Sequence, residues 1–486
     1  MTSAGSGRIL QPGINCWRIE HTHRFAPIID AATYFRIARQ AMLHAQHRIM
    51  LIGWEFDTRV RLDRCDRMQQ VPVRLGAFIG ALAERRPQLE IFILQWRAGF
   101  LQAFLRGRTP FGVLGWALHR RIHFKLAGDH PKGACHHEKL IVVDDAVAFC
   151  GGIDITGDRW DTPRHRDRDP HRRRPSGRSY GPFHDVATAM DGAAARALGD
   201  LARERWRRAT GRALAPVSAG SSPWPRCLEP LVQEVDVAIA RTEPLYDKRP
   251  EVREIEALYL SAIAAAKRSI YLESQYFASR RVAQALARRL GEPQGPEVIV
   301  INPESADGWL QEIVMGAARA RWLALIKQAD RHGRFRIYTP ATDGGKPIYV
   351  HAKVMVIDDR LLRVGSSNLN NRSMGFDTEC DVALEASQTH AADAPVRQAI
   401  VGLRDRLIAE HLGIKQDVFS TAVAQRDSLA AAIEALRTRA GRSLVPFIAP
   451  PISEQEALIA EHEHLDPERP RRLGGQIKAL LKDLLT

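Results

Sequence analysis

The sequence predicts an α/β protein built from two related halves and followed by a helical tail. Three observations support this fold class. The chain has 486 residues, more than one hydrophobic core usually supports. Two stretches of sequence occur twice, in the same order and at nearly the same spacing. Each copy passes from a helical pattern into a short apolar run of the kind that forms a buried strand.

The first repeated stretch predicts a helix followed by a strand in each half. Residues 45–56 read AQHRIMLIGWEF, and residues 266–277 read AKRSIYLESQYF. The residues that are identical 221 positions apart are Ala45 and Ala266, Ile49 and Ile270, Leu51 and Leu272, and Phe56 and Phe277. In both copies a helical pattern leads into an apolar strand, which is the order of an αβ unit.

The second repeated stretch carries polar residues at matching places. Residues 134–152 read ACHHEKLIVVDDAVAFCGG, and residues 348–366 read IYVHAKVMVIDDRLLRVGS. The matches lie 214 positions apart: His137 with His351, Lys139 with Lys353, and Asp144 with Asp358. A single long repeat indicates two copies of a domain, not a solenoid. We therefore expect a first domain over residues 1–215 and a second over residues 226–415, joined by the Pro-, Ser- and Gly-containing stretch APVSAGSSPWP at 215–225.

The remaining residues, 416–486, are predicted to form a helical C-terminal extension. Thr421–Ala440 has the pattern of a surface helix, and Ser453 with Glu456 has the spacing of a capping box. Gln476–Leu485 places its leucines and Ile477 on one helical face. We expect that face to pack on the protein itself and not on a membrane.

The balance of charge points to an anionic partner. The formal net charge is +14, which suits nucleic acid, an acidic membrane surface or a phosphorylated substrate, although a basic surface also serves solubility. Pro163–Arg178 (PRHRDRDPHRRRPSGR) holds seven arginines and two aspartates. It is either a solvated loop or a segment that draws the protein toward anionic lipid.

The cysteines and the apolar runs indicate a cytoplasmic protein. Six scattered cysteines with no C-x-x-C pair suit reduced thiols. Residues 1–13 have no apolar core, so no signal peptide is expected, and no run approaches the roughly 18 apolar residues of a membrane span. Contact with a membrane would then be peripheral.

The two H-x-K-x4-D motifs suggest phosphate chemistry. His137–Asp144 and His351–Asp358 both continue into apolar β-branched runs, so both are predicted to be strands. Side chains alternate along a strand, so the histidine and lysine of each motif share a face. The lysine can neutralise phosphate oxygens, and the histidine can attack phosphorus or move a proton. Asp144 and Asp358 lie at odd spacings from the histidines, so we interpret them as positioning residues.

A small-residue turn follows each motif, and other sites are less well supported. Gly151–Asp154 (GGID) and Gly365–Asn368 (GSSN) both begin seven residues after the motif aspartate, where small residues allow close approach of a phosphate. A zinc site from His130, Cys135, His136 and His137 is an alternative, but adjacent His136 and His137 would face opposite ways on a strand. There is no phosphate-binding G-x-x-x-x-G-K-[ST] loop and no G-x-G-x-x-G.

These motifs resemble the two signatures of the phospholipase D superfamily. The first resemblance comprises His137–Asp144, Gly151–Asp154 and Gly157–Asp161, and the second comprises His351–Asp358, Gly365–Asn368 and Asn371–Ser373. The strand ends Trp54–Asp57 and Glu273–Phe277 are also similar to that family. The likeness covers roughly residues 15–415. It implies two tandem α/β sandwich domains related by a pseudo-twofold axis, with one active site at their junction.

The resemblance also implies roles for individual residues. His137 would be the nucleophile that forms a phosphohistidine, and His351 the general acid and then the base. Phosphate binding would involve Lys139, Lys353, Asn368, Ser366 and Gly152, and an acid behind each histidine would be supplied by Asp185 and Glu379. Asp154 occupies the position of Asn368 in the first copy, where an acid would repel phosphate, so we expect it to face away or to bond a neighbour.

The expected activity is hydrolysis of glycerophospholipids to phosphatidic acid and a free head group, with transphosphatidylation as a related outcome. The alternatives are a cardiolipin-synthase-like phosphatidyl transferase, a nuclease of the same superfamily and a non-catalytic basic binding protein. No cofactor and no metal are expected, because two histidines and two lysines supply the charge that a metal would. The expected partners are a phospholipid substrate and an anionic membrane surface. Nucleic acid is disfavoured, and a monomer is expected.

Overall fold

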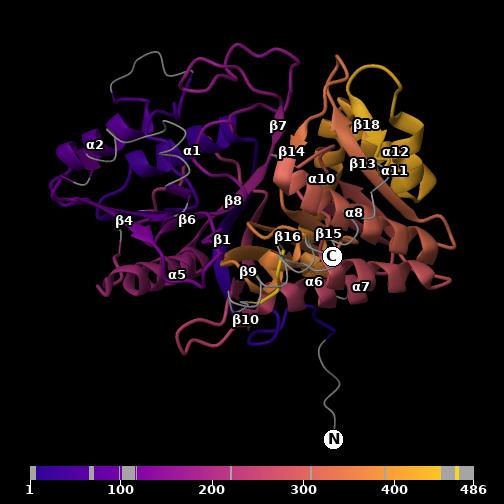
Figure 1. Ribbon diagram of the computed structural model, residues 1–486, viewed down its shortest axis with the longest axis horizontal. Helices are drawn as coiled ribbons and strands as arrows, with labels where there is room; N and C mark the ends of the chain where they lie inside the picture. Colours follow the sequence, from indigo (N-terminus) through magenta and orange to yellow (C-terminus); the bar gives the residue numbers. More distant parts are fainter. Residues whose placement is uncertain are drawn as a thin grey trace, which may run out of the picture.

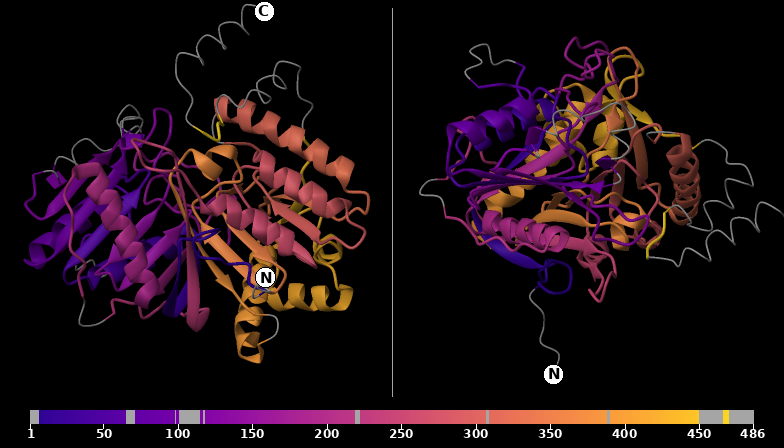
Figure 2. Two further views of the ribbon diagram at one scale, coloured as in Figure 1. Left: turned by 90° about the horizontal axis from the view of Figure 1, so that it is seen from below. Right: turned by 60° about the vertical axis from the view of Figure 1, so that its left-hand side comes forward.

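The computed structural model describes most of the chain. The described residues are 7–64, 71–97, 99–100, 115–116, 118–218, 222–306, 309–387, 390–449 and 466–469. The first half of the chain lies on the left in Figure 1 and the second half on the right, with strands β1 and β9 between them. Figure 2 shows the same two halves from two further directions.

Helices and strands alternate through both halves. The elements of the first half are β1 (Arg18–Ile29), α1 (Ala31–Leu43), β2 (Arg48–Gly53), α2 (Leu75–Arg85), β3 (Glu90–Trp96), β4 (Ile122–Ala127), β5 (Leu140–Val143), β6 (Val147–Gly151), β7 (Phe183–His184), β8 (Val186–Asp191) and α5 (Gly192–Thr210). The second half begins with β9 (Val232–Glu243), β10 (Val252–Arg253), α6 (Glu254–Ala265), β11 (Ser269–Glu273), α7 (Arg280–Gly291), β12 (Glu297–Ile301) and α8 (Trp309–Ala329). It continues with β13 (Phe335–Ala341), β14 (Tyr349–Val350), β15 (Val354–Ile357), β16 (Leu361–Gly365), α9 (Asn371–Gly375), β17 (Glu379–Glu385), a 3₁₀ turn at Ala391–Asp393 and α10 (Ala394–Leu412).

Sixteen strands of the described chain form one sheet. The strand order of its first half, counted outward from the centre, matches that of its second half. From the centre outward, the first half runs β1-β8-β6-β5-β2-β3-β4 and the second half runs β9-β17-β16-β15-β11-β12-β13. The pairings correspond as well, since β2-β3-β4 and β11-β12-β13 are parallel and the other neighbours are antiparallel. The α/β fold class is therefore confirmed.

The registers show that the repeated sequence forms equivalent structure. Ile49 in β2 pairs with Val143, immediately before Asp144, and Ile270 in β11 pairs with Ile357, immediately before Asp358. These central strands are buried along their whole length, which is why they read as continuous apolar runs and not as alternating ones.

Three large hydrophobic clusters of the described residues cover the sheet. One contains residues of α5 and α10 and so joins the two halves, a second contains residues of α1 and α2, and a third contains residues of α6, α7 and α8. The helices of the second half lie stacked beside its strands in the left panel of Figure 2. The continuous cluster between α5 and α10 makes the junction of the halves a packed interior.

The predicted linker and tail differ in detail from what the structure shows. The stretch between α5 and β9 has no helix or strand among its described residues. Helix α10 ends at Gly413, whose φ of 69° is the left-handed conformation that closes a helix. Helices at the C-terminus are confirmed, but the single surface helix predicted over 421–440 is wrong. Two helices occur, α11 (Gln416–Arg426) and α12 (Leu429–Leu436), because Asp427 adopts φ 50° and Ser428 caps the second.

The tail also contributes a strand that its helical pattern did not predict. Strand β18 (Ser443–Pro446) pairs antiparallel with β13 and so covers that edge of the sheet. Further on, Asp466 accepts hydrogen bonds from the backbone amides of Asn371 and Arg372, both at 2.9 Å. The predicted capping box at Ser453 and the helix at Gln476–Leu485 lie outside the described residues.

The arginine-rich segment 163–178 is not simply a solvated loop. Arg172 is only 1% exposed and forms an ion pair with Asp161 at 3.0 Å, while Arg174 pairs with Asp158 at 2.7 Å. Neither of the two alternatives considered for this segment, a solvated loop or a contact with anionic lipid, holds for Arg172, because its guanidinium is buried against Asp161. The arginines of the segment that remain exposed are Arg164, Arg166, Arg168, Arg173 and Arg178. Within the described residues, no helix is long and apolar enough to cross a membrane.

Candidate active site

The two motif histidines are positioned by backbone hydrogen bonds that cross between the halves. Contrary to the prediction, the strands begin only at Leu140 and Val354, after the His-x-Lys residues. The preceding backbone pairs with the opposite half instead. The amide of His137 donates to Thr378 O at 2.9 Å, and the amide of His351 donates to His184 O at 2.8 Å. Each motif is therefore anchored in the half to which it does not belong.

An acid from the opposite half also holds each imidazole. His137 Nδ1 lies 2.9 Å from Glu379 Oε2, and His351 Nδ1 lies 2.8 Å from Asp185 Oδ2. Both acids are fully buried. Because Nδ1 of each ring is engaged, Nε2 is the ring nitrogen available for chemistry, and the acid fixes which tautomer is present. Neither of these two His–acid pairs lies within one half.

The small residues of the two turns support these acids. Ser366, expected to bind phosphate, instead donates its hydroxyl to Glu379 at 2.5 Å, and Ser373 donates to the same carboxylate at 2.6 Å. Gly152 occupies the position equivalent to Ser366, and a Cβ there would collide with the carboxylate of Asp185. The amide of Gly152 donates to Val186 O at 3.0 Å, so it is not available for phosphate. Ser366 and Gly152 therefore position the acids.

The two lysines point back toward their own histidines. Lys139 Nζ donates to His137 O at 2.7 Å and lies 3.3 Å from Asp154, while Lys353 Nζ donates to His351 O. Asp154 thus bonds a neighbouring lysine, which was one of the two outcomes expected for it. An ammonium has three donors, so each lysine retains hydrogen-bonding capacity for phosphoryl oxygens.

Asn368 and the motif aspartates occupy different surroundings. Asn368 is buried, and its Oδ1 atom, an acceptor, has no hydrogen-bond partner in the described part of the chain. Binding of a phosphoryl oxygen would use the NH₂ group of the same side chain, which is its donor. Asp144 accepts hydrogen bonds from the amides of residues 46–48, and Asp358 accepts from the amides of residues 267–269. These carboxylates thereby fix the starts of β2 and β11 and take no direct part in the reaction centre.

Burial and the clustered cations favour neutral imidazoles in the free protein. Burial, with Lys139 and Lys353 adding to it, lowers the pKa of His137 well below its usual value. Burial and Lys353 do the same for His351. Burial also raises the pKa of Asp185 to about 7 and lowers the pKa of Lys353 to about 7. A bound phosphodiester would supply the missing negative charge and make protonation of His351 more favourable.

The structure adds residues that the motifs did not identify. Arg159 lies within electrostatic reach of His351, Asp185 and Lys353, and its guanidinium is 5.0 Å from the ring of Phe183. It belongs to the Gly157–Asp161 stretch, but nothing in that stretch indicated that its side chain returns to the histidines. An aromatic ring flanks each imidazole, with Trp54 centred 5.6 Å from His137 and Phe183 centred 5.5 Å from His351.

The zinc site considered from the sequence does not assemble. His136 Nε2 lies 3.0 Å from Asp129, whereas His137 faces Glu379, so the adjacent rings have different partners. In the described ranges, the groups of histidines and carboxylates close enough to hold a metal ion lie elsewhere in the fold.

Comparison with known sequences relates the second half of the chain to one family by two overlapping matches. Residues 259–394 match the family described as "Cardiolipin synthase, PLD-like domain", and residues 341–457 match "Phospholipase D". The chain is 23% identical to phospholipase D A of Dictyostelium discoideum, over 79% of this chain and 35% of that protein. It is 26% identical to phospholipase D alpha 1 of Ricinus communis, over 78% of this chain and 64% of the relative. The chain thus spans between about a third and two thirds of the length of these relatives.

Among solved structures, the fold is similar to that of phosphatidylserine synthase from Haemophilus influenzae. The superposition has a TM-score of 0.50 at 14% identity and covers 80% of this chain and 88% of that protein. At this identity the likeness concerns the fold.

Proposed function

The chain belongs to the phospholipase D superfamily, and we propose that it hydrolyses glycerophospholipids to phosphatidic acid and a free head group. The observation that carries the proposal is the crossed pairing of His137 with Glu379 and of His351 with Asp185. This pairing draws both motifs into one reaction centre.

In the first step, His137 Nε2 attacks phosphorus while the bond from phosphorus to the head-group oxygen breaks. His351 donates its Nε2 proton to the departing alkoxide, which leaves as a neutral alcohol. A covalent intermediate of this kind divides one difficult displacement into two easier ones. Lys139, Lys353 and Asn368 bind the non-bridging oxygens, where charge-assisted hydrogen bonds in a dry site are strong.

In the second step, His351 removes a proton from water as the water oxygen attacks phosphorus. The bond between phosphorus and His137 breaks, and phosphatidic acid leaves. An alcohol in place of water would give transphosphatidylation. The two histidines and two lysines supply the charge and proton transfers, so the chemistry itself needs no metal ion. One chain provides both motifs and both acids, so a monomer suffices.

A phosphatidyl transferase is the second candidate, because residues 259–394 match a family described by cardiolipin synthase. It would use the same intermediate and resolve it with the hydroxyl of a second lipid. The test incubates the purified chain with phosphatidylcholine, phosphatidylglycerol and a plasmid, with EDTA present, and identifies the products. Phosphatidic acid with free choline or glycerol supports hydrolysis, cardiolipin supports transfer, and cut plasmid alone supports a nuclease.

His137→Asn protein is the matched control in that assay. It should be inactive on every substrate that the wild type cleaves. Rapid loss of wild-type activity on addition of EDTA, followed by recovery with added metal, would contradict a reaction carried by the histidines and lysines.

A further inference from the structure

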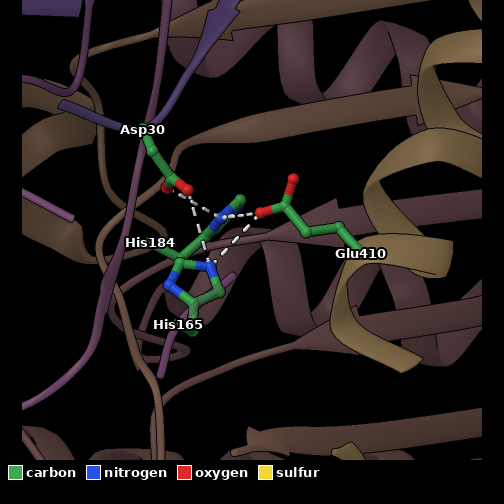
Figure 3. Close-up of side chains that lie close together, drawn as sticks. All are labelled: Asp30, His165, His184 and Glu410. Carbon is green, nitrogen blue, oxygen red and sulfur yellow. Dashed lines mark hydrogen bonds and ion pairs between the residues drawn. The ribbon is translucent and has the colours of Figure 1, made fainter. Parts of the chain in front are cut away.

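A buried cluster of two histidines and two carboxylates lies behind the reaction centre. Its members come from four separate segments: Asp30 at the end of β1, His165 in the arginine-rich segment, His184 in β7 and Glu410 in α10. Figure 3 shows their nitrogen and oxygen atoms converging on one point. Asp30, His165 and His184 are completely inaccessible to solvent, and the Glu410 side chain is 6% exposed.

We infer that these four residues form a binding site for a divalent transition-metal ion, zinc foremost. Glu410 Oε1 lies 3.3 Å from His165 Nε2 and 3.1 Å from His184 Nδ1. Asp30 Oδ1 lies 3.3 Å from His184 Nδ1, and its other oxygen, Oδ2, lies 3.6 Å from His165 Nε2. In a tetrahedral site with metal–ligand bonds of about 2.0–2.1 Å, ligand atoms are separated by about 3.3–3.4 Å, so these distances fit its edges.

The outer nitrogens of the two rings show a different geometry. His165 Nδ1 lies 3.0 Å from Asp161, and His184 Nε2 lies 2.9 Å from Glu273, which are ordinary hydrogen-bond lengths. A metal-bound histidine usually donates its other N–H to a carboxylate in this way, which fixes the ring and increases its basicity. Each ring therefore has an outer carboxylate at 2.9–3.0 Å and an inner Glu410 oxygen at 3.1–3.3 Å, and the inner distances fit both a hydrogen bond and a pair of metal ligands.

Asp30 provides an independent indication of a missing partner. Its Oδ2 atom is buried and has no hydrogen-bond partner among the described residues. Asp30 occupies the N-cap position of α1, yet its side chain makes no capping hydrogen bond. Its φ of 63° and ψ of 147° lie in a region that essentially only glycine adopts, and φ of His165 is also positive, at 39°. The chain thus holds both residues in strained conformations that direct their side chains inward.

The charges define what the cluster can hold. Both nitrogens of each ring face carboxylates, so each ring requires either two protons or one proton and a metal ion. A divalent ion with two neutral imidazoles carries the same charge as two imidazolium ions. Two nitrogens and two oxygens suit zinc, whereas calcium and magnesium need larger sets of oxygen ligands.

The proposed ion would brace the catalytic histidine without touching the substrate. His184 directly precedes Asp185, and its carbonyl oxygen accepts the hydrogen bond from the His351 amide. Both contacts that hold His351, the one with His184 and the one with Asp185, therefore depend on where His184 is fixed. The ion would also join the arginine-rich segment of the first half to α10 of the second. This gives the segment a structural role, since His165 belongs to it and Arg172 pairs with Asp161.

The test is metal analysis of the full chain purified from zinc-supplemented medium, without any substrate. We expect about one zinc per chain that survives dialysis against EDTA, because the ligands are buried. Glu410→Gln should reduce the bound zinc at least tenfold. Glu243→Gln is the matched control, since it alters a buried carboxylate that pairs with Arg205 and Arg208, outside the cluster, and it should retain zinc.

Refolding of wild-type protein provides a second measurement if Glu410→Gln does not fold. Metal-stripped chain refolded with Co²⁺ should show the intense visible bands of tetrahedral cobalt, and Zn²⁺ should raise its melting temperature. Less than one tenth of a metal ion per chain, together with no effect of Zn²⁺ on melting, would overturn the proposal and assign the cluster to two imidazolium ions. Because neither readout involves phospholipid, the result is independent of the proposed activity.

Discussion

Replacing Glu379 with glutamine is a sharper test of the crossed His–acid pairing than replacing the other acid, Asp185. Glu379 accepts hydrogen bonds from His137 Nδ1 at 2.9 Å, Ser366 Oγ at 2.5 Å and Ser373 Oγ at 2.6 Å. Ser366 donates to Oε2 and Ser373 donates to Oε1, and His137 Nδ1 lies within 3.0 Å of both oxygens. In glutamine an NH₂ group replaces one of these oxygens, so one serine loses its acceptor and a donor faces His137 Nδ1. That nitrogen must then accept, the ring proton moves to Nε2, and the lone pair that attacks phosphorus is lost.

We expect Glu379→Gln to reduce kcat by about 10⁴, the loss found when the acid behind an oriented catalytic histidine becomes an amide. This corresponds to about 5.4 kcal/mol of transition-state stabilisation at 1.36 kcal/mol per tenfold. KM should change little, because Lys139, Lys353 and Asn368 remain. The assay is steady-state hydrolysis of a soluble short-chain phospholipid, with urea unfolding to verify the fold and Glu243→Gln as the control. A kcat within tenfold of wild type in folded Glu379→Gln protein would refute the role assigned to Glu379.

Three further outcomes follow from the same contacts. Asp358→Ala leaves three backbone amides without their acceptor and should lower the free energy of unfolding, measured in urea, by about 3 kcal/mol or more. The control is Asp359→Ala, which removes a half-exposed neighbouring carboxylate and should have little effect. Burial raises the pKa of Asp185 from 3.8 to about 7, so its contribution to stability is full below about pH 4 and is lost as the pH rises through 7. Asp185→Asn should therefore gain stability relative to wild type as the pH rises from about 4 to about 7 in urea titrations, and an unchanged difference would contradict the shift. The third change neutralises three exposed arginines, Arg164, Arg166 and Arg168. It should weaken binding to anionic vesicles by up to about 1 kcal/mol per charge and leave hydrolysis of a soluble phospholipid unchanged. Intact vesicle binding would exclude this surface as the membrane contact.

Much of the fold could be predicted because the sequence contains two copies of the same structural unit. The matches of Ile49 with Ile270 and of Asp144 with Asp358 correspond to equivalent strand registers, since identical local patterns form identical units. The tail was harder, because a four-residue strand such as β18 is formed by pairing with β13 and not by its own periodicity.

Part of the candidate site could be predicted for the same reason. Repetition singles out the histidines and lysines, but sequence spacing does not reveal which half supplies which partner. The contact between His137 and Glu379 spans 242 positions, and the position of Arg159 beside His351 depends on tertiary folding. Arg172 looked like a surface charge among other arginines, yet an ion pair with Asp161 buries it.

The most direct test of the central claim is to trap the covalent intermediate with a substrate that needs no general acid. Phosphatidyl-p-nitrophenol has a leaving group that departs as a stable anion. His351→Asn protein should therefore release one equivalent of p-nitrophenolate per chain and then stall, with the lipid phosphoryl group attached to His137 on peptide mapping. His137→Asn protein should show neither burst nor label. A labelled His351, or a full burst from the His137→Asn protein, would contradict the assignment of His137 as nucleophile.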